Sequence, residues 1–350
     1  MKKKLFYIGS ILVLLLYFVL FPFPLGRELY FIPGGKKNAE QINTARAHGP
    51  FYGVEFADYT GFVDPDLRFT VLMKIKHYTA LSDCFMIPFD PADPAKEIMD
   101  PAGEKTGSFS GNGFPVVIQS RIFVYDAAQN MLEERDKSGN RLWRISTPSL
   151  ITAMSATESL VLIGYVDGHC VLLDKNGSEL VNYRPGGSRI EAVYGVRLSH
   201  SGNMFAVISG LDPQRFIVLE KRETDYRPLD HTELKTNYRR PVNIYFSEDD
   251  SRIYWEGNYQ VNIYNVEERF FQQYNLDGQP VFIDQDGEEG KITLLMTNDK
   301  KRYQLELRND KDRVLFRDLY YADFAGIYVR DELYYIVMDN DILLLKKREG

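Results

Sequence analysis

After about residue 50, the chain consists of short apolar runs separated by polar turns, and no run keeps a helical period over a useful length. Tyr and Phe fill many of these runs, with 23 Tyr and 22 Phe against only two Trp. Aromatic and β-branched residues favour half-buried strands. The pattern therefore predicts an all-β structure.

Two consecutive segments repeat one pattern. Residues 120–143 align with residues 158–181, so that the tetrapeptide at 136–139 (DKSG) falls on the one at 174–177 (DKNG). Each unit is predicted to contain a strand, a turn, a second strand, a DK(S/N)G hairpin and a short final strand. Glycine suits the hairpin because it accepts a positive φ without steric cost.

Weaker copies of the second strand of this unit recur along the chain. The equivalent positions are Phe69, Ile122, Leu160, Met204, Ile253, Ile292 and Leu333. Their mean spacing of about 44 residues, with four strands per unit, is typical of a β-propeller blade. We therefore predict a propeller domain over residues 28–350 with seven blades of four strands, and six or eight blades as alternatives.

The last predicted unit lacks a fourth strand, because the chain ends soon after residues 342–347. An unpaired edge would expose backbone donors and acceptors, and a propeller avoids this when both ends of the chain build one blade. Residues 28–32 (ELYFI) are predicted to supply the missing strand. Residues 52–57 are the alternative.

Residues 88–113 differ in composition from the rest of the chain, being rich in Pro, Asp and Gly. Such a segment buries too little apolar surface to order by itself. We predict a solvated loop between the first two blades. A protrusion that binds a partner is the alternative, because long loops on a rigid scaffold often carry function.

The N-terminus holds an uncharged stretch at residues 5–25, preceded by Lys2, Lys3 and Lys4. At about 1.5 Å per residue this stretch spans about 30 Å, and the lysines favour a cytoplasmic N-terminus. We expect residues 1–27 to form a cytoplasmic stub and a single transmembrane helix in the inner membrane, with the propeller on the extracytoplasmic, periplasmic side. A cleaved signal, for which residues 21–25 offer no small-residue cleavage site, and a buried helix are alternatives.

Net charge restricts the class of binding partner, and the positions of the cysteines bear on disulfide formation. The formal net charge of −7 argues against binding to nucleic acid, whose backbone is also negative. Cys84 and Cys170 fall in the predicted third strands of two units with a whole blade between them. A disulfide tolerates at most about 7 Å between Cα atoms, so we predict that both thiols are free and buried.

A search for chemistry assigns no catalytic, cofactor-binding or metal-binding residue, and no cofactor. The five histidines show no metal-ligand spacing; they are His48, His77, His169, His200 and His231. His169 and Cys170 are adjacent, and neighbouring residues on a strand point to opposite faces.

Other suggestive runs are predicted to be structural. Residues 284–289 (DQDGEE) lack the further ligands of a calcium loop and are predicted to form a hairpin turn. The aromatic pairs Tyr334–Tyr335 and Phe270–Phe271 are predicted to pack between blades. No nucleophile elbow, phosphate loop or zinc-protease motif occurs.

Residues 115–145 resemble a blade of the pyrroloquinoline-quinone-like propeller superfamily, through residues 121–124 (RIFV) and 136–143 (DKSGNRLW). Residues 151–183 match less fully, with Val181 in place of the tryptophan, and later units could equally be called WD40-like. The resemblance implies either a quinone-dependent dehydrogenase that binds calcium, or a non-enzymatic scaffold such as the propeller lipoprotein of the outer-membrane protein assembly machine. One tryptophan-docked blade and no assignable ligand set favour the scaffold.

We therefore expect a membrane-anchored, non-catalytic scaffold that binds another protein of the cell envelope. The alternative is an enzyme or small-molecule sensor with its site at the mouth of the central channel. The first strand of each blade lines that channel in propellers, so the residues expected near it are Thr152, Glu191, Asn243, Asp284 and Asp323.

Overall fold

A computed structural model describes residues 11, 16, 17, 29–45, 49–285, 291–299, 301–309 and 311–349. Within these residues no helix has the length and apolar character needed to cross a membrane. The transmembrane helix predicted over residues 5–25 falls almost entirely outside the described residues, and the predicted fold is corrected on this point.

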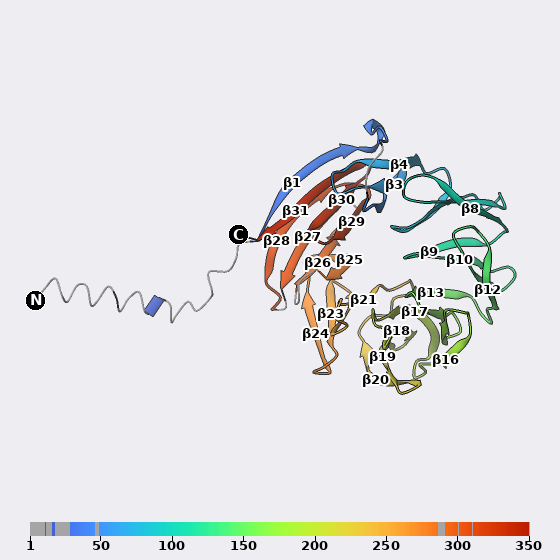
Figure 1. The fold of residues 1–350 in the computed structure, drawn as a ribbon. Coiled ribbons are helices and arrows are strands. Elements are labelled where there is room, and N and C mark those ends of the chain that lie inside the picture. Colours follow the sequence, from blue (N-terminus) through green and yellow to red (C-terminus); the bar gives the residue numbers. More distant parts are fainter. Residues whose placement is uncertain are drawn as a thin grey trace, which may run out of the picture.

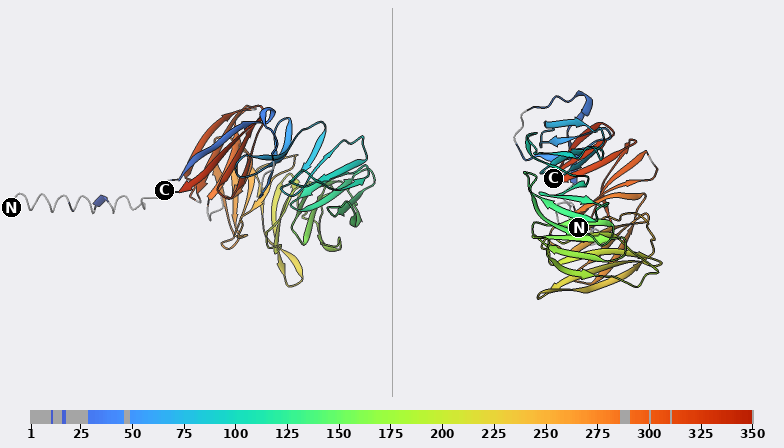
Figure 2. Two further views of the ribbon diagram at one scale, coloured as in Figure 1. Left: turned by 45° about the horizontal axis from the view of Figure 1, so that its top comes forward. Right: turned by 90° about the vertical axis from the view of Figure 1, so that its right-hand side faces the viewer.

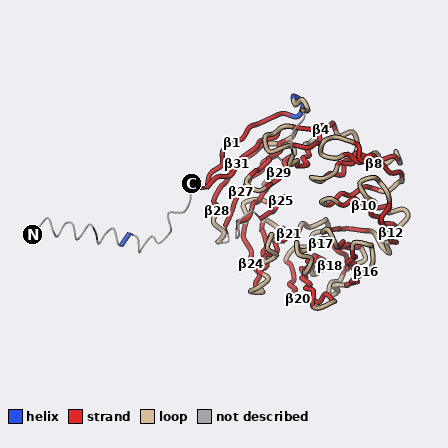
Figure 3. Tube along the Cα trace, in the orientation of Figure 1, coloured by secondary structure: helices blue, strands red, loops and turns tan. Residues whose placement is uncertain are grey.

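The described strands form eight antiparallel sheets arranged around a central axis (Figures 1 and 3). We number these sheets as blades 1 to 8 in the order of the chain. Within each blade we name the strands from the innermost outward. Blade 1 contains β2 (Tyr52–Glu55), β3 (Tyr59–Val63) and β4 (Phe69–Lys74), and blade 2 contains β5 (Tyr78–Leu81), β6 (Met86–Phe89), β7 (Ala95–Met99) and β8 (Lys105–Ser110). Blade 3 contains β9 (Phe114–Ile118), β10 (Arg121–Asp126), β11 (Met131–Arg135) and β12 (Arg141–Ser146). Blade 4 contains β13 (Ile151–Ala156), β14 (Leu160–Tyr165), β15 (Cys170–Asp174) and β16 (Glu179–Tyr183).

The second half of the ring follows the same order. Blade 5 contains β17 (Ile190–Leu198), β18 (Met204–Leu211), β19 (Gln214–Arg222) and β20 (Asp225–Leu234), and blade 6 contains β21 (Ile244–Phe246), β22 (Arg252–Gly257), β23 (Gln260–Asn265) and β24 (Phe270–Asn275). Blade 7 contains β25 (Gln279–Gln285), β26 (Lys291–Thr297), β27 (Arg302–Asn309) and β28 (Val314–Tyr321). Blade 8 contains β29 (Ala325–Arg330), β30 (Leu333–Met338), β31 (Asp341–Glu349) and β1 (Leu29–Asn38).

Both ends of the propeller domain build blade 8. β1 pairs antiparallel with β31, from Leu29 opposite Glu349 to Asn38 opposite Asp341. Figure 2 shows β1, in blue, against the red C-terminal strands. The predicted closure of the ring by the segment at residues 28–32 is confirmed, and the alternative segment at residues 52–57 instead begins blade 1. A short 3-10 helix, η1 (Ala39–Gln41), follows β1.

The prediction of seven blades is wrong, because residues 88–113 contain β7 and β8 rather than a loop between blades. Their aspartates lie in turns: Asp90 and Asp93 each accept a backbone N–H two residues further on, at 2.8 Å. Ile98 and Phe109 are buried in a core cluster with residues of blade 3. Pro and Asp therefore shape the hairpins, while a few apolar residues hold the strands.

One tight turn recurs before the last strand of five blades. The first residue of the turn accepts, through its side chain, the backbone N–H groups two and four residues later. These residues are Asp64, Asp100, Asp136, Asp174 and Asn309. The fourth residue has a positive φ, which is 90° at Gly139 and 80° at Gly177. The predicted DK(S/N)G hairpins are confirmed.

Blade 1 lacks a first strand within the described residues. The β2–β3 turn lies beside the turn between the second and third strands of blade 8, because Ala57 donates its N–H to the Asp339 carbonyl (3.0 Å). The β3–β4 turn, headed by Asp64, has the form found before the last strand elsewhere. β2, β3 and β4 therefore take the second, third and fourth positions, and β2 borders the channel.

The hydrophobic core lies between neighbouring blades. Between blades 3 and 4, for example, Phe123 and Trp143 pack against Val161 and Val171. Tyr334 and Tyr335 are fully buried in two such clusters, which confirms the predicted packing role of this pair. Of the other aromatic pair only Phe271 packs inward, and Phe270 is exposed.

Candidate functional site

The structure does not bring the five predicted channel residues together. Thr152, Glu191 and Asp284 lie on first strands, Asn243 lies just before β21, and Asp323 lies in the connection between β28 and β29. The Asp323 side chain is 74% exposed and forms an ion pair with Lys301 at 2.8 Å. This set forms no single constellation at the channel mouth.

Two side chains cap the channel-facing edge of β2, where a first strand would otherwise pair. The Tyr328 hydroxyl accepts the N–H of Glu55 at 2.9 Å and donates to the Glu55 carbonyl at 3.4 Å. The Asp83 carboxylate accepts the N–H of Gly53 at 3.0 Å. Burial raises the pKa of Tyr328 to about 12. Blades 8 and 2 thus satisfy the edge that blade 1 leaves open.

Arg330 also lies beside this edge of β2 and forms a bidentate ion pair with Asp83, at 2.8 and 2.9 Å. Burial disfavours the charged guanidinium, but the hydrogen bonds and charge of Asp83, with a contribution from Asp284, outweigh it and raise the Arg330 pKa. The guanidinium also lies 5.7 Å from the centre of the Tyr52 ring. The pair therefore links blades 8 and 2 across blade 1.

A cavity of about 350 Å³ lies between β25 and β29, and its walls are mainly apolar. Its lining includes Phe282, Ile327, Tyr328 and Arg330. A Cβ added to Gly326 would lie 3.9 Å from the Phe324 ring, which is ordinary van der Waals contact, so this glycine leaves room for a small side chain. Among the described residues no group of three or more His, Cys, Asp or Glu could hold a metal ion.

The two faces of the ring differ in which turns they carry. Because strands alternate in direction, the connections between blades share one face with the turns between second and third strands. We call this the connector face. The turns between first and second strands, and between third and fourth strands, lie on the opposite face.

Exposed aromatic side chains meet on the connector face of blades 2 and 3. Tyr78 begins β5 and is 59% exposed, and Phe114 begins β9 and is 46% exposed. Phe89, at the end of β6, lies between them: its ring centroid is 5.5 Å from that of Tyr78 and 6.0 Å from that of Phe114. The three rings form a continuous aromatic surface.

Further exposed apolar side chains follow on the same face of blades 4 and 5. Phe114 is paired across strands with Tyr125, whose hydroxyl accepts the N–H of Ile151 at 3.1 Å. Leu150, which precedes β13, is 51% exposed, and its carbonyl accepts the N–H of the exposed Val166 at 2.9 Å.

The next turn leads to blade 5. A Cβ on Gly168 would lie 2.6 Å from the side chain of Glu191, next to the exposed Ile190. We call the resulting row the apolar band. Its members are Tyr78, Phe89, Phe114, Leu150, Val166 and Ile190.

Pairs of polar side chains within the protein flank the band. His77 lies 3.3 Å from Asp90 on blade 2, and Arg184 lies 2.7 Å from Glu191 between blades 4 and 5.

Two further pairs lie nearby, Asp167 with His169 at 2.5 Å and Arg189 with Asp212. Most charged groups at the edge of the band therefore have partners in the same chain; Lys76, exposed in the β4–β5 connection beside Tyr78, forms no ion pair with the described residues.

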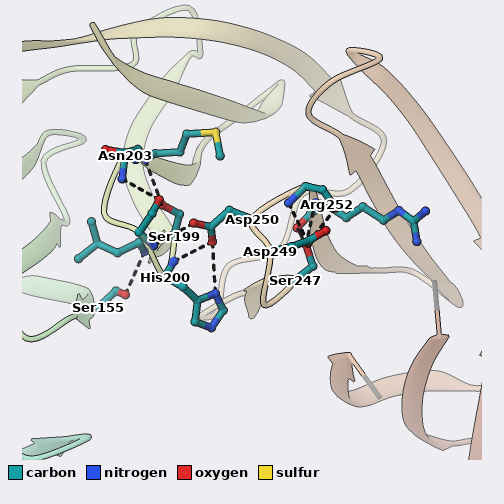
Figure 4. A network of polar contacts seen from close by, with 12 residues as sticks. Ser155, Ser199, His200, Asn203, Ser247, Asp249, Asp250 and Arg252 are labelled. Atoms are coloured by element: carbon teal, nitrogen blue, oxygen red, sulfur yellow. Dashed lines mark hydrogen bonds and ion pairs between the residues drawn. The ribbon is translucent and has the colours of Figure 1, made fainter. Parts of the chain in front are cut away.

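On the opposite face, a polar network joins blades 5 and 6 (Figure 4). The Asp250 carboxylate accepts the backbone N–H groups of His200 at 2.7 Å and Ser201 at 2.9 Å. Burial alone would raise the pKa of Asp250, but these hydrogen bonds lower it. Ser155 extends the series to blade 4, because its hydroxyl accepts the N–H of Leu198 at 3.0 Å. This face is held by contacts between turns.

The two cysteines are free, as predicted. Cys170 lies buried in β15, and burial raises its pKa to about 12. Cys84 lies in the β5–β6 turn and is only partly buried, so its predicted place in a buried third strand is wrong.

His231 lies on β20, and His48 is outside the described residues, as is most of the predicted turn at residues 284–289.

Sequence reasoning did not find the apolar band. Tyr, Phe, Leu, Val and Ile at strand ends have the same appearance in the sequence as core residues. Only the position of each strand end on the connector face exposes them. A weak signal exists, because several members directly follow a connection between blades.

Comparison with known proteins agrees with this architecture. The sequence model of a family described as "beta-propeller protein" matches residues 1–350. An uncharacterized protein of Treponema pallidum (strain Nichols) is 24% identical over 272 residues, covering 73% of this chain and 71% of that protein.

Similar solved structures include BamB from Moraxella catarrhalis, with a TM-score of 0.62, 11% identity, and coverage of 91% of this chain and 100% of that one. The computationally designed Ika8 protein has a TM-score of 0.60 with 11% identity, covering 87% of this chain and 95% of its own. KlHsv2 with loop 6CD replaced by a Gly-Ser linker has a TM-score of 0.53 with 12% identity, covering 76% and 92%. At these identities the likeness concerns the fold.

Proposed function

The chain belongs to a family of beta-propeller proteins, and we propose that it acts as a non-catalytic scaffold that docks a protein partner on the apolar band. The observation that carries the proposal is the series of exposed aromatic and aliphatic side chains on one face of blades 2 to 5, of which Tyr78, Phe89 and Phe114 are in direct ring contact. Contiguous apolar patches on soluble proteins commonly mark interaction sites.

Other exposed apolar side chains are more scattered. Several lie on fourth strands at the outside of the ring, namely Leu142, Leu180, Phe270, Leu319 and Tyr321. Two more lie on the connector face outside blades 2 to 5, Tyr259 in the β22–β23 turn and Phe324 in the β28–β29 connection. Single exposed apolar residues are normal on a protein surface.

The location of the protein is part of the proposal. We propose that the propeller works in the extracytoplasmic part of the cell envelope and that its partner is an envelope protein. The support is the uncharged sequence of residues 5–25 after three lysines, together with the resemblance of blade 3 to propellers of that compartment. Fractionation of cells with an antibody to the propeller tests the location, and recovery in the cytoplasm contradicts it.

The docking proposal is tested by affinity purification from crosslinked cells. Phe114→Ala combined with Leu150→Ala removes the centre of the band, and we expect the partner to be lost. The matched control combines Leu142→Ala with Leu180→Ala, two fourth-strand residues of which Leu142 is 58% exposed. The control should retain the partner. Equal recovery with both double variants would exclude the band as the docking site.

A second candidate function, binding of a small molecule at the channel, is favoured by the cavity beside Gly326. Gly326→Val would fill part of this space. A quinone-like absorbance of the purified protein, or heat released on addition of calcium, would support this function if Gly326→Val abolished it. A colourless protein indifferent to calcium removes the dehydrogenase form of the proposal.

A further inference from the structure

We infer that the partner docks on the apolar band through an uncharged apolar segment in extended conformation. This inference rests on the proposed function and specifies the chemistry of the partner. Two features of the described residues carry it: the internal pairing of most of the flanking charges, and the arrangement of the band as a row.

Apart from Lys76 at the Tyr78 end, the flanking charges give little attraction to a charged partner. His77 faces Asp90, Arg184 faces Glu191, and the guanidinium of Arg189 faces Asp212. A charged side chain brought to this edge would have to compete with a partner already present, and it would lose part of its own hydration. An uncharged segment avoids that cost.

The band offers side chains rather than backbone pairing. The N–H of Ile151 is bonded to the Tyr125 hydroxyl, and the N–H of Val166 is bonded to the Leu150 carbonyl. These groups are therefore not available to an added strand. Binding at this place depends on burial of apolar surface, which is not directional.

The shape of the band selects an elongated occupant. Each of blades 2 to 5 contributes one or two exposed apolar side chains, so the surface is a row across consecutive blades. A segment in extended conformation presents alternate side chains on one side, about 6.6 Å apart, and can contact successive members of such a row. A single side chain inserted into one socket would contact only part of it.

Photo-crosslinking in intact cells identifies the segment. p-Benzoylphenylalanine replaces Val166, at the edge of the band, and in the control strain it replaces Leu142 on β12. We expect a protein adduct from position 166 and not from position 142. Sequencing of the crosslinked peptide by mass spectrometry should give a segment with apolar side chains and without Asp, Glu, Lys or Arg.

The captured segment is then synthesised, and its affinity for the full chain is measured by calorimetry at about 50 mM and about 500 mM salt. We expect the affinity to change less than about twofold, because screening acts on charged contacts. Phe114→Ala should weaken binding by about tenfold or more, as central aromatic residues do, and Leu142→Ala should leave it unchanged.

The outcomes separate the two proposals. A charged crosslinked segment, or an affinity that falls about tenfold at the higher salt, overturns this inference while docking on the band stands. Adducts that form equally from both positions, from neither, or only with lipid overturn the proposed function and this inference with it.

Discussion

Arg330 at the end of β29 and Asp83 in the β5–β6 turn form a bidentate ion pair that passes across blade 1 and joins blades 8 and 2. Asp83 also accepts the N–H of Gly53, so one carboxylate both neutralises the guanidinium and caps the free edge of β2. Where a first strand is lacking in the described residues, side chains from the two adjacent blades complete the inner wall.

Asp83→Ala should lower the free energy of unfolding by about 1–2 kcal/mol, because it leaves Arg330 and the N–H of Gly53 without their acceptor. The pair is about one-third exposed, which limits the loss through solvent screening. Urea unfolding measures this change in the free energy of unfolding. The control Asp323→Ala removes an exposed ion pair and should change stability by at most about 0.5 kcal/mol. Equal effects of the two substitutions would contradict a structural role for the pair.

The buried ion pair of Arg121 and Glu134 should contribute more to the free energy of unfolding than the pair of Arg330 and Asp83. The guanidinium makes two hydrogen bonds to Glu134, at 2.7 and 2.6 Å, and donates to the carbonyls of Thr157 and Leu160 on blade 4. Glu134→Leu leaves a buried charge uncompensated, and we expect a loss of about 3 kcal/mol or more.

The double variant Arg121→Met with Glu134→Leu supplies the control for this pair. It should recover part of the loss, because an apolar pair no longer buries an unpaired charge. A double-mutant cycle from denaturant unfolding gives the coupling. Additive losses in the cycle would mean that the two side chains act independently.

The blade pattern could be predicted from the sequence because second strands are buried on both faces and form continuous apolar runs. Ile122, Leu160, Met204 and Leu333 all lie on second strands, as expected. Phe69 does not, because it begins β4, the fourth strand of blade 1. The sequence pattern does not reveal that blade 1 starts with a second strand.

Blade 2 could not be recognised because its outer strands are polar. β7 and β8 place only Ile98 and Phe109 in the core, and the other buried side chain of β7 is Lys96. The Lys96 ammonium donates to the carbonyls of Asp93, Pro94 and Gly111, at 3.2, 3.3 and 2.7 Å. A buried lysine held by backbone carbonyls has no signature in composition or periodicity.

The two thiols should differ in reactivity. In the native state we expect Cys84 to react with a thiol reagent faster than Cys170, which is buried and whose pKa burial raises to about 12. Under denaturing conditions without reductant both should react, because neither is in a disulfide. Time-resolved labelling followed by peptide mapping measures both rates. Faster native labelling of Cys170 would contradict its placement in β15.

Asp250 should make stability depend on pH. Its folded-state pKa is lowered, since hydrogen bonds from Ser201 and His200 outweigh the effect of burial, and its ordinary value is 3.8. A depressed carboxylate pKa stabilises the fold above the unfolded-state value, and that contribution is lost as pH falls through the folded-state value.

Stability from this group should therefore be complete at pH 6 and decline below about pH 4. Asp250→Asn removes the titrating group, so its unfolding free energy should fall less steeply between about pH 5 and pH 2.5 than that of the wild type. Asp225→Asn is the control, because this exposed aspartate on β20 makes only local contacts: it accepts the N–H of Tyr226 at 2.8 Å and pairs weakly with Arg227 at 3.7 Å. Identical pH profiles for wild type and Asp250→Asn would show that the network between blades 5 and 6 does not depend on the charged carboxylate.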